Sequence, residues 1–313
     1  MTDKRPARTE ECKALRDALA QRYGEATGDW SAVAAALAAA ATVAGAADAV
    51  HEASDTTAQR QAALTRLAGH RSSRAFTETP PPLDLVRAIA AIAFSAPSKS
   101  DLQQRDLVVV EDADTLTRLK ALLAHQPWTA AAPRLMVVCG NNRRQRQLHD
   151  LRGHPFVNDH VDALFNAAVD AGILIQAFIT AAEAVGLACC PISGIRDHAD
   201  TVSDVLALPD FVFPVAGLAI GWPSGEDPIS MRLPLSVTVH VDRHDDANVA
   251  AAIDGYDARR ARTNPYANQR GVDRFGELPN DRYGWSEDKA RQYAEPERAD
   301  FGAFIKKKRF RLI

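Results

Sequence analysis

The feature that most constrains the fold is a long, largely apolar segment from Val161 to Leu187, which predicts a helix. Gly186, close to its end, is a C-cap signal. Short apolar runs lie before and after this segment, and they predict buried strands at Leu107–Val110, Arg134–Cys139 and Phe213–Ile220. Strands with helices between them predict a layered α/β or α+β domain.

The periodicity of apolar residues predicts further helices, and one more apolar run predicts a strand. The helices are expected at Glu10–Gln21, from about Asp29 through Val43, from about Asp55, at Leu83–Phe94 and at Asp114–His125, and the strand at Val237–Val241.

Composition divides the chain into three parts. Residues 1–65 are rich in alanine and charge and predict a helical N-terminal extension. Residues 66–245 alternate helices and strands and form the predicted core domain. Residues 246–313 are polar and rich in Arg, Asn, Tyr and Gly, so we expect an arm that wraps its own domain or a partner subunit.

Composition also excludes several classes of protein. The 313 residues carry 37 Lys plus Arg and 40 Asp plus Glu, a net charge of −3, which argues against a dedicated nucleic-acid binder. No uninterrupted apolar run reaches the ~18–20 residues that cross a bilayer, and no signal peptide is evident, so we expect a cytoplasmic protein without a membrane partner. The four cysteines are not spaced as a metal site or disulfide framework. The adjacent Cys189 and Cys190 indicate buried packing rather than a redox pair.

Motifs for common catalytic sites are absent from the sequence. It contains no Gly-x-Ser-x-Gly elbow, His-Glu-x-x-His pair, Walker loop or Gly-x-Gly-x-x-Gly turn. His149, His154 and His160 are spaced so that they do not share one helical face, so we expect no metal site.

Four segments carry groups suited to a phosphate or a planar polar ligand. His70–Arg74 supplies two guanidinium groups and two hydroxyls, although a solvated basic turn has the same composition. Ser95–Gln103 is dense in small hydrogen-bonding residues, and Cys190–Gly194 follows the long helix. Gly221–Pro234 ends a strand and adds Arg232.

In this order, the four segments resemble the nitroreductase family of FMN-dependent NAD(P)H oxidoreductases over about residues 66–245. The His-Arg-Ser-x-Arg form of residues 70–74 is similar to the larger, NADPH-preferring branch of flavin reductases and nitroreductases. The resemblance implies that FMN is bound by His70, Arg71, Ser72, Arg74, Pro97, Ser98, Lys99, Ser100, Asp101, Gln103, Pro191, Ile192, Ser193, Gly194, Gly221 and Arg232.

The resemblance also implies roles for these groups. Arg71, Arg74 and Arg232 would bind the phosphate, and Gln103 the ring system or ribityl hydroxyls. The backbone of Ser193 and Gly194 would lie near flavin N5, so no catalytic side chain is required. Two positions depart from the family pattern: Asp101 stands where asparagine is usual, and Ser230 where lysine is frequent. Lys99 is a candidate to compensate.

The family fold implied is α+β: a mixed, largely antiparallel sheet flanked by helices, in a homodimer with FMN at the interface. The implied activity is hydride transfer from NADPH or NADH through flavin N5 to a small-molecule acceptor, a nitroaromatic, a quinone or free flavin, in a ping-pong cycle. The N-terminal extension leaves open a specialised dehydrogenase or dehalogenase of the same fold. The replaced asparagine and lysine leave open a flavin-binding protein without turnover.

Two basic clusters near the C-terminus have two interpretations each. Arg259, Arg260 and Arg262 would lie near the nicotinamide cofactor or on a solvated helix face. The Lys306–Arg311 run is interpreted as a solvated or dimer-bound tail.

Overall fold

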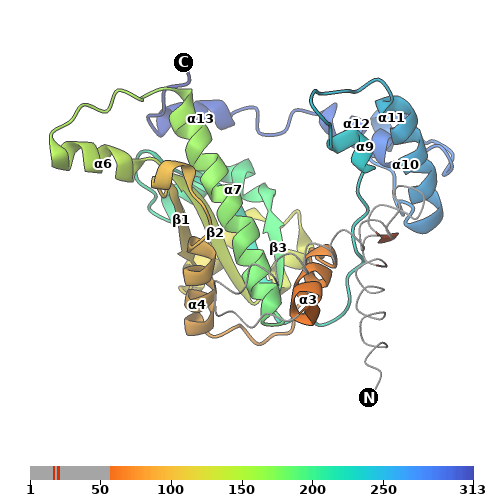
Figure 1. The fold of residues 1–313 in the computed structure, drawn as a ribbon, viewed down its shortest axis with the longest axis horizontal. Helices are drawn as coiled ribbons and strands as arrows, with labels where there is room; N and C mark the ends of the chain where they lie inside the picture. The colour runs from red at the N-terminus through yellow and green to blue at the C-terminus, as the bar shows by residue number, and fades with distance from the viewer. Residues whose placement is uncertain (1–16, 18–19, 22–56) are drawn as a thin grey trace. The chain divides into compact units, whose positions relative to one another are not determined.

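The computed structural model describes Asp17, Ala20, Gln21 and residues 57–313. The chain forms two compact units, and Figure 1 shows their elements. Unit 1 comprises Met1–Arg71 and Pro228–Pro296, and unit 2 comprises Ser72–Asp227 and Glu297–Ile313. The helices expected before residue 57 lie outside the described residues, apart from Asp17, Ala20 and Gln21, which are helical.

The centre of unit 2 is a four-stranded sheet in the order β1-β2-β4-β3, with every neighbouring pair antiparallel. Its strands are β1 (Arg105–Val109), β2 (Arg134–Asn141), β3 (Ala188–Ile192) and β4 (Val212–Gly221). The predicted α+β class with a largely antiparallel sheet is confirmed. Strand β3 was expected to be part of a loop, because it is short and contains Pro191. Pairing with β4, which the sequence does not reveal, makes it a strand.

One face of the sheet is covered by α4 (Leu83–Phe94) and α7 (Val161–Ala184). Figure 1 shows α7 running across the strands, with α4 beside their ends. Met136 and Val138 of β2 point into this layer and pack with Leu174 and Phe178 of α7. Because side chains alternate along a strand, Leu135 and Val137 point to the opposite face.

The opposite face is covered by shorter helices. They are α5 (Ala113–Leu122), α8 (Ala199–Val205) and the 3-10 helices η4 (Pro127–Ala131) and η5 (Ser193–His198). Helix α6 (Arg143–Arg152) follows β2, and η3 (Lys99–Asp101) precedes β1.

Among the described residues, α7 is the one helix long and apolar enough to cross a membrane. Its buried residues include Leu174 and Phe178, which lie in the core against the sheet. Packing in the core of unit 2 therefore accounts for its apolar composition.

The C-terminal segment packs within unit 2. Helix α13 (Phe301–Lys307) contributes Phe304 and Ile305 to a third core cluster, and Phe310 contacts the rings of Phe211 and Phe213 edge-on. The basic side chains of Lys306, Lys307, Arg309 and Arg311 are exposed to solvent, as expected for a solvated segment, but Lys308 and Phe310 of the same run are buried. Lys308 is buried and donates to Ser203 and to the Leu208 carbonyl, and its basic neighbours pair with Asp159, Asp200 and Asp210.

Unit 1 is helical in its described residues. It contains α3 (Thr57–Ala68), α9 (Leu235–Thr238), α10 (Val249–Thr263), α11 (Val272–Phe275) and α12 (Trp285–Tyr293). The helix predicted from about Asp55 is confirmed as α3. The strand predicted at Val237–Val241 is wrong: this segment begins inside α9 and continues without regular structure. No described strand pairs with it, and a single strand leaves its backbone groups without ladder partners.

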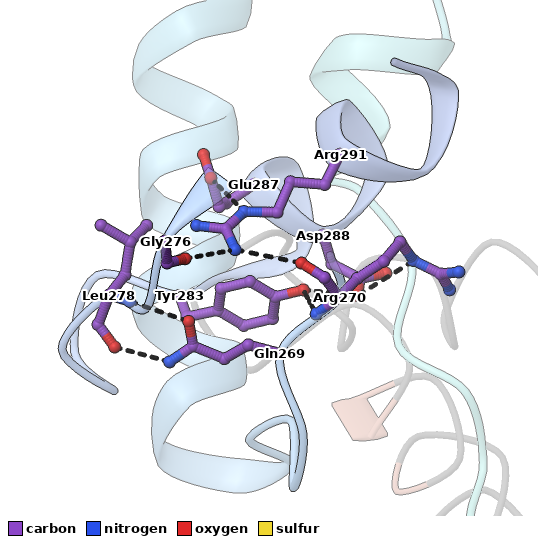
Figure 2. A network of polar contacts seen from close by, with 8 residues as sticks. All are labelled: Gln269, Arg270, Gly276, Leu278, Tyr283, Glu287, Asp288 and Arg291. Carbon is purple, nitrogen blue, oxygen red and sulfur yellow. Dashed lines mark hydrogen bonds and ion pairs between the residues drawn. The ribbon is translucent and has the colours of Figure 1, made fainter. Parts of the chain in front are cut away.

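Side chains fix the long connection between α10 and α12, as Figure 2 shows. The Tyr283 hydroxyl accepts a hydrogen bond from the Arg270 amide and donates one to Asp288. Arg291, buried in α12, donates to the carbonyls of Arg270 and Gly276 and pairs with Glu287. The Gln269 side chain closes the loop through both backbone groups of Leu278. These bonds join the buried side chains of Tyr283, Asp288 and Arg291 to the backbone of the connection.

Candidate functional site

The loop from Pro97 to Gln103, predicted to line the flavin, has unusual backbone geometry. Ser100, Asp101 and Gln103 have positive φ angles of 50°, 57° and 53°. Such angles are unfavourable for residues other than glycine, although aspartate tolerates them well. Residues in sparsely populated backbone regions are maintained only when their surroundings determine them, and they gather at functional sites.

Two buried side chains hold this loop in its conformation. The carboxylate of Asp170, on α7, accepts hydrogen bonds from the amides of Lys99 and Gln104, each at 2.9 Å. Arg105, the first residue of β1, donates to the carbonyls of Phe94, Ala96 and Pro97. Both side chains are nearly inaccessible to solvent, at 0% and 3% exposure. They therefore act as fixed anchors beneath the loop.

Helix α6 holds the other side of the loop. Gln145 donates to the Leu102 carbonyl at 2.6 Å, and Arg144 donates to the Gln103 carbonyl at 2.5 Å while pairing with Asp106. A polar cavity of about 180 Å³ lies beside these contacts. It is lined in part by Lys99, Leu102, Gln104, Asn142 and Gln145.

The outer side chains of the loop are exposed to solvent and make few polar contacts with the rest of the protein. Gln103 donates through Nε2 to Asp101 at 3.1 Å, and the Ser98 hydroxyl accepts from the Gln103 amide. The ammonium group of Lys99 has no hydrogen bond or ion pair with another described residue. Asp101 thus acts as an acceptor within the loop, a role that the Oδ1 of asparagine also fills.

The end of β3 presents Ser193 and Gly194, the pair predicted to lie near flavin N5. A Cβ built on Gly194 would lie 2.5 Å from Nε2 of Gln126 and 3.1 Å from Nε2 of His125. A side chain at this position would displace the ends of the Gln126 and His125 side chains, which approach from the segment before η4. The Ser193 hydroxyl accepts from Arg298 at 3.4 Å.

The predicted phosphate-binding element begins in unit 1 and ends in unit 2. In unit 2, Ser73 is buried: its amide donates to the Cys189 carbonyl and its hydroxyl to Asp227 at 2.6 Å. Arg74 is exposed, and its guanidinium lies over the Trp128 ring. It forms no hydrogen bond or ion pair with another described residue, so its donors face solvent.

The remaining phosphate candidates belong to unit 1. Arg71 donates to the Gly69 carbonyl at 3.4 Å, and His70 is partly buried beside it. Arg232 is exposed and donates to the Met231 carbonyl at 3.1 Å. It also borders a cavity of about 310 Å³ whose walls include Met231, Tyr256 and Trp285.

Packing explains other residues that the sequence singled out. A Cβ on Gly221 would meet Pro133 at 2.7 Å and Phe76 at 2.8 Å, so this glycine permits a close contact inside the core. Trp222 packs against the core cluster beneath α7. Cys189 and Cys190 are buried free thiols, and burial raises the pKa of each, which keeps them protonated and unreactive.

Within unit 2, Arg74 lies over Trp128 and follows Ser73, which bonds to Cys189 of β3, whereas Gln126 approaches Gly194 just after the end of β3. No hydrogen bond or ion pair among the described residues joins this group to the Pro97–Gln103 loop. Sequence reasoning missed the supporting residues Arg105, Gln126, Arg144, Gln145 and Asp170. Of these, Asp170 left a signal, because it is a carboxylate within an apolar helix.

Comparison with known proteins agrees with this arrangement. Residues 67–222 match the nitroreductase family, and residues 230–313 match the nitroreductase family C-terminal domain. A protein named FMN reductase [NAD(P)H] from Bacillus subtilis is 31% identical over 212 residues, which cover 66% of this chain and 83% of that protein. An oxygen-insensitive NADPH nitroreductase from Salmonella typhimurium is 33% identical over 57% of this chain and 72% of its own length.

The fold agrees as well. The solved structure of NfrA2 from B. megaterium is 29% identical, with a TM-score of 0.69, and the match covers 80% of this chain and 98% of that one. The residues that shape the strained loop and the end of β3 thus lie in a chain that belongs to the nitroreductase family.

Proposed function

We propose that this protein is an FMN-dependent oxidoreductase that uses NADPH or NADH to reduce nitroaromatic, quinone or flavin acceptors in a ping-pong cycle. The observation that carries the proposal is the exposed guanidinium of Arg74, which lies over the Trp128 ring and makes no hydrogen bond or ion pair with another described residue, in a chain of this family. Relatives named FMN reductase and NADPH nitroreductase support it.

The donor set fits FMN. A phosphate dianion is bound best by guanidinium groups, which donate paired, charge-assisted hydrogen bonds. Arg74 has its donors free for that purpose. The other proposed ligands are Arg71, Arg232, His70 and Ser72. For the ribityl chain and the ring, we propose the remaining predicted residues: Pro97, Ser98, Lys99, Ser100, Asp101, Gln103, Pro191, Ile192, Ser193, Gly194 and Gly221.

Bound FMN supplies the redox chemistry, accepting hydride at N5 and passing it on. The protein's own groups then have three tasks. The Lys99 ammonium would supply positive charge to the site, and positive charge favours an anionic form of a bound group. The rigid loop on Asp170 and Arg105 limits reorganisation during transfer. The backbone of Ser193 and Gly194 would lie near flavin N5.

The direct test is the visible absorption spectrum of the purified protein before and after NADPH is added without oxygen. We expect the bands of oxidised flavin, and their bleaching within seconds. A colourless protein that takes up no added FMN would contradict the proposal. Flavin that stays oxidised would favour binding without turnover.

We also propose a homodimer with FMN at the interface. Helix α7 carries an exposed apolar stripe of Val161, Phe165 and Val169, and α6 adds exposed Leu148 and Leu151. Exposed apolar groups in such number favour burial by a partner. A site shared by two subunits is also consistent with the finding that no hydrogen bond or ion pair among the described residues joins the Pro97–Gln103 loop to the Ser193–Gly194 segment. Sedimentation of wild type and of Phe165→Glu tests this: we expect a dimer and a monomer respectively.

The remaining parts follow the same proposal. We propose residues 1–65 as a helical extension, 66–245 as the FMN-binding core and 246–313 as an arm that completes the dimer. Arg259, which donates to the Arg232 carbonyl, is proposed with Arg260 and Arg262 to face the nicotinamide cofactor. We propose a cytoplasmic location and no nucleic-acid or membrane partner.

A further inference from the structure

The backbone on both sides of Arg74 is attached to other parts of unit 2. The Ser73 amide donates to the Cys189 carbonyl of β3 at 3.0 Å. The Ser224 amide, in the segment after β4, donates to the Ala75 carbonyl at 3.2 Å. The residue before Arg74 and the residue after it are therefore both fixed by backbone hydrogen bonds.

A hydrogen bond between two side chains adds a third attachment. Ser73 is 4% exposed, and its hydroxyl lies 2.6 Å from a carboxylate oxygen of Asp227, which also belongs to the segment after β4. The Ala75 carbonyl is farther from this hydroxyl, at 3.3 Å, so the single hydroxyl hydrogen is donated to the carboxylate. Hydrogen bonds to an ionised acceptor are stronger than those between neutral groups. Asp227 thus holds Ser73 across 154 positions of sequence.

These attachments place Arg74 without using any of its own hydrogen-bond donors. Its guanidinium lies 5.9 Å from the centroid of the Trp128 ring, and an aromatic face attracts a cation at that distance. The guanidinium is otherwise exposed, with no hydrogen bond or ion pair to another described residue. A group that is ordered before its ligand arrives loses less conformational entropy on binding. The arrangement therefore suits the capture of an anion by Arg74.

We propose that Asp227 is a positioning residue for phosphate recognition. Through the Ser73 hydroxyl it fixes the backbone that carries Arg74, and it thereby favours a phosphorylated flavin, FMN, over riboflavin, which lacks the phosphate. The proposal rests on the proposed function, because it takes Arg74 as a ligand of the FMN phosphate. The family resemblance assigns no role to Asp227, or to Ser73, which occupies the variable position of the Arg-Ser-x-Arg element.

The negative charge of Asp227 acts against phosphate binding, and this makes positioning and charge separable. A carboxylate repels a phosphate dianion, so an effect of charge alone would strengthen FMN binding in every variant that removes the carboxylate. An effect of positioning depends instead on whether residue 227 can still accept a hydrogen bond from Ser73. Asp227→Asn and Asp227→Leu both remove the charge, but only the asparagine keeps an acceptor oxygen.

The first experiment measures the dissociation constants of FMN and of riboflavin by fluorescence titration of the full chain freed of flavin. Asp227→Leu should bind FMN about three- to tenfold more weakly, the size of one hydrogen bond, and riboflavin within about twofold of wild type. Asp227→Asn should bind FMN within about twofold of wild type or more tightly. A general loss of structure would instead weaken the binding of both flavins equally.

Ser73→Ala removes the other half of the same bond and should also weaken FMN binding alone. The double variant Ser73→Ala/Asp227→Leu should bind FMN no more weakly than either single variant, because both residues act through one contact. Thr115→Ala is the matched control: the Thr115 hydroxyl also donates to a carboxylate of unit 2, Asp112, at 2.7 Å. Its loss should leave both affinities unchanged.

Three results would overturn the inference and leave the proposed function intact. They are FMN binding by Asp227→Leu that is as tight as in wild type or tighter, equal losses for FMN and riboflavin, and losses that add in the double variant. If Asp227→Leu does not fold, the FMN and riboflavin affinities of Ser73→Ala decide the question, since that change removes the same bond.

A second readout needs no flavin. In the full chain freed of flavin, titration with inorganic phosphate should shift the NMR resonance of the Arg74 Nε–H group. The shift should require a higher phosphate concentration in Asp227→Leu than in wild type, by the factor seen for FMN. Equal concentrations in the two proteins overturn the inference. If wild type binds no FMN at all, the proposed function fails, whereas this titration still decides whether Asp227 positions Arg74.

Discussion

Asp170 and Lys99 are joined by a hydrogen bond from the Lys99 amide to one oxygen of the Asp170 carboxylate, at 2.9 Å. The other oxygen accepts from the Gln104 amide. One buried carboxylate thus holds both ends of a loop with three residues at positive φ. The two hydrogen bonds satisfy the buried carboxylate and hold the backbone on both sides of the residues at positive φ.

Replacing Asp170 should therefore destabilise the protein. Asp170→Asn keeps the shape of the side chain but removes its charge. It also directs a side-chain N–H donor towards a backbone N–H donor. We expect a loss of about 1.5–3 kcal/mol in the free energy of unfolding, the range for a hydrogen bond to a charged group. Urea denaturation measures it. Asp162→Asn, exposed on the same helix, should lose less than about 1 kcal/mol; an equal loss in both variants would contradict the anchoring role.

The phosphate assignment makes a prediction about flavin retention. Arg71→Ala and Arg74→Ala should each weaken FMN binding about tenfold or more, since a hydrogen bond to a charged group contributes roughly 1.5–3 kcal/mol. The ratio of flavin to protein after gel filtration measures this. Arg87→Ala removes the same charge from an exposed site on α4 and should retain flavin. Full retention in both Arg71 and Arg74 variants would refute the assignment.

A side chain at position 194 should weaken FMN binding more than it destabilises the fold. In Gly194→Ala, the added carbon meets the ends of the Gln126 and His125 side chains, which can move. The free energy of unfolding should therefore change by less than about 1 kcal/mol, while FMN affinity falls about threefold or more. Gly225→Ala is the control, because nothing lies within 4 Å of its added carbon. Unchanged affinity in Gly194→Ala would place the cofactor elsewhere.

The C-terminal residues should stabilise unit 2. Phe310 is 3% exposed, and its ring contacts Phe211 and Phe213 at centroid distances of 5.8 and 5.4 Å. Phe310→Ala should cost about 3–5 kcal/mol of unfolding free energy. Tyr293→Ala, at a site 75% exposed, should stay within about 0.5 kcal/mol of wild type. Thermal denaturation of both variants distinguishes a packed segment from a loose tail.

The carboxyl group of Asp288 should make the stability of unit 1 depend on pH. Burial raises the pKa of Asp288, but hydrogen bonds from Lys289 and Tyr283 and the charges of Lys289 and Arg270 outweigh it and leave the pKa below its usual 3.8. A depressed pKa means that the carboxylate contributes stability above that value and loses it as the pH falls further. The difference in unfolding free energy between wild type and Asp288→Asn should thus narrow between about pH 5 and about pH 3. A difference that does not vary with pH would contradict this.

The sequence by itself determined the elements whose residues carry strong local patterns. The strands at Leu107–Val110, Arg134–Cys139 and Phe213–Ile220 and the helix from Val161 were predictable, because apolar runs and helical periodicity reflect burial directly. The segments proposed for the flavin site were recognisable by their order, since arginine, serine and proline at fixed spacing can be read without knowledge of the fold.

Tertiary structure alone decided which residues support those segments. Strand β3 exists because β4 offers it partners, and Val237–Val241 is not a strand because the described residues offer it none. Asp170 reaches Lys99 across 71 positions, and Arg298 reaches Ser193 across 105. Such contacts depend on how the chain returns on itself. A local sequence pattern indicates which side chains are buried. It does not indicate which distant backbone groups the buried charged side chains will contact.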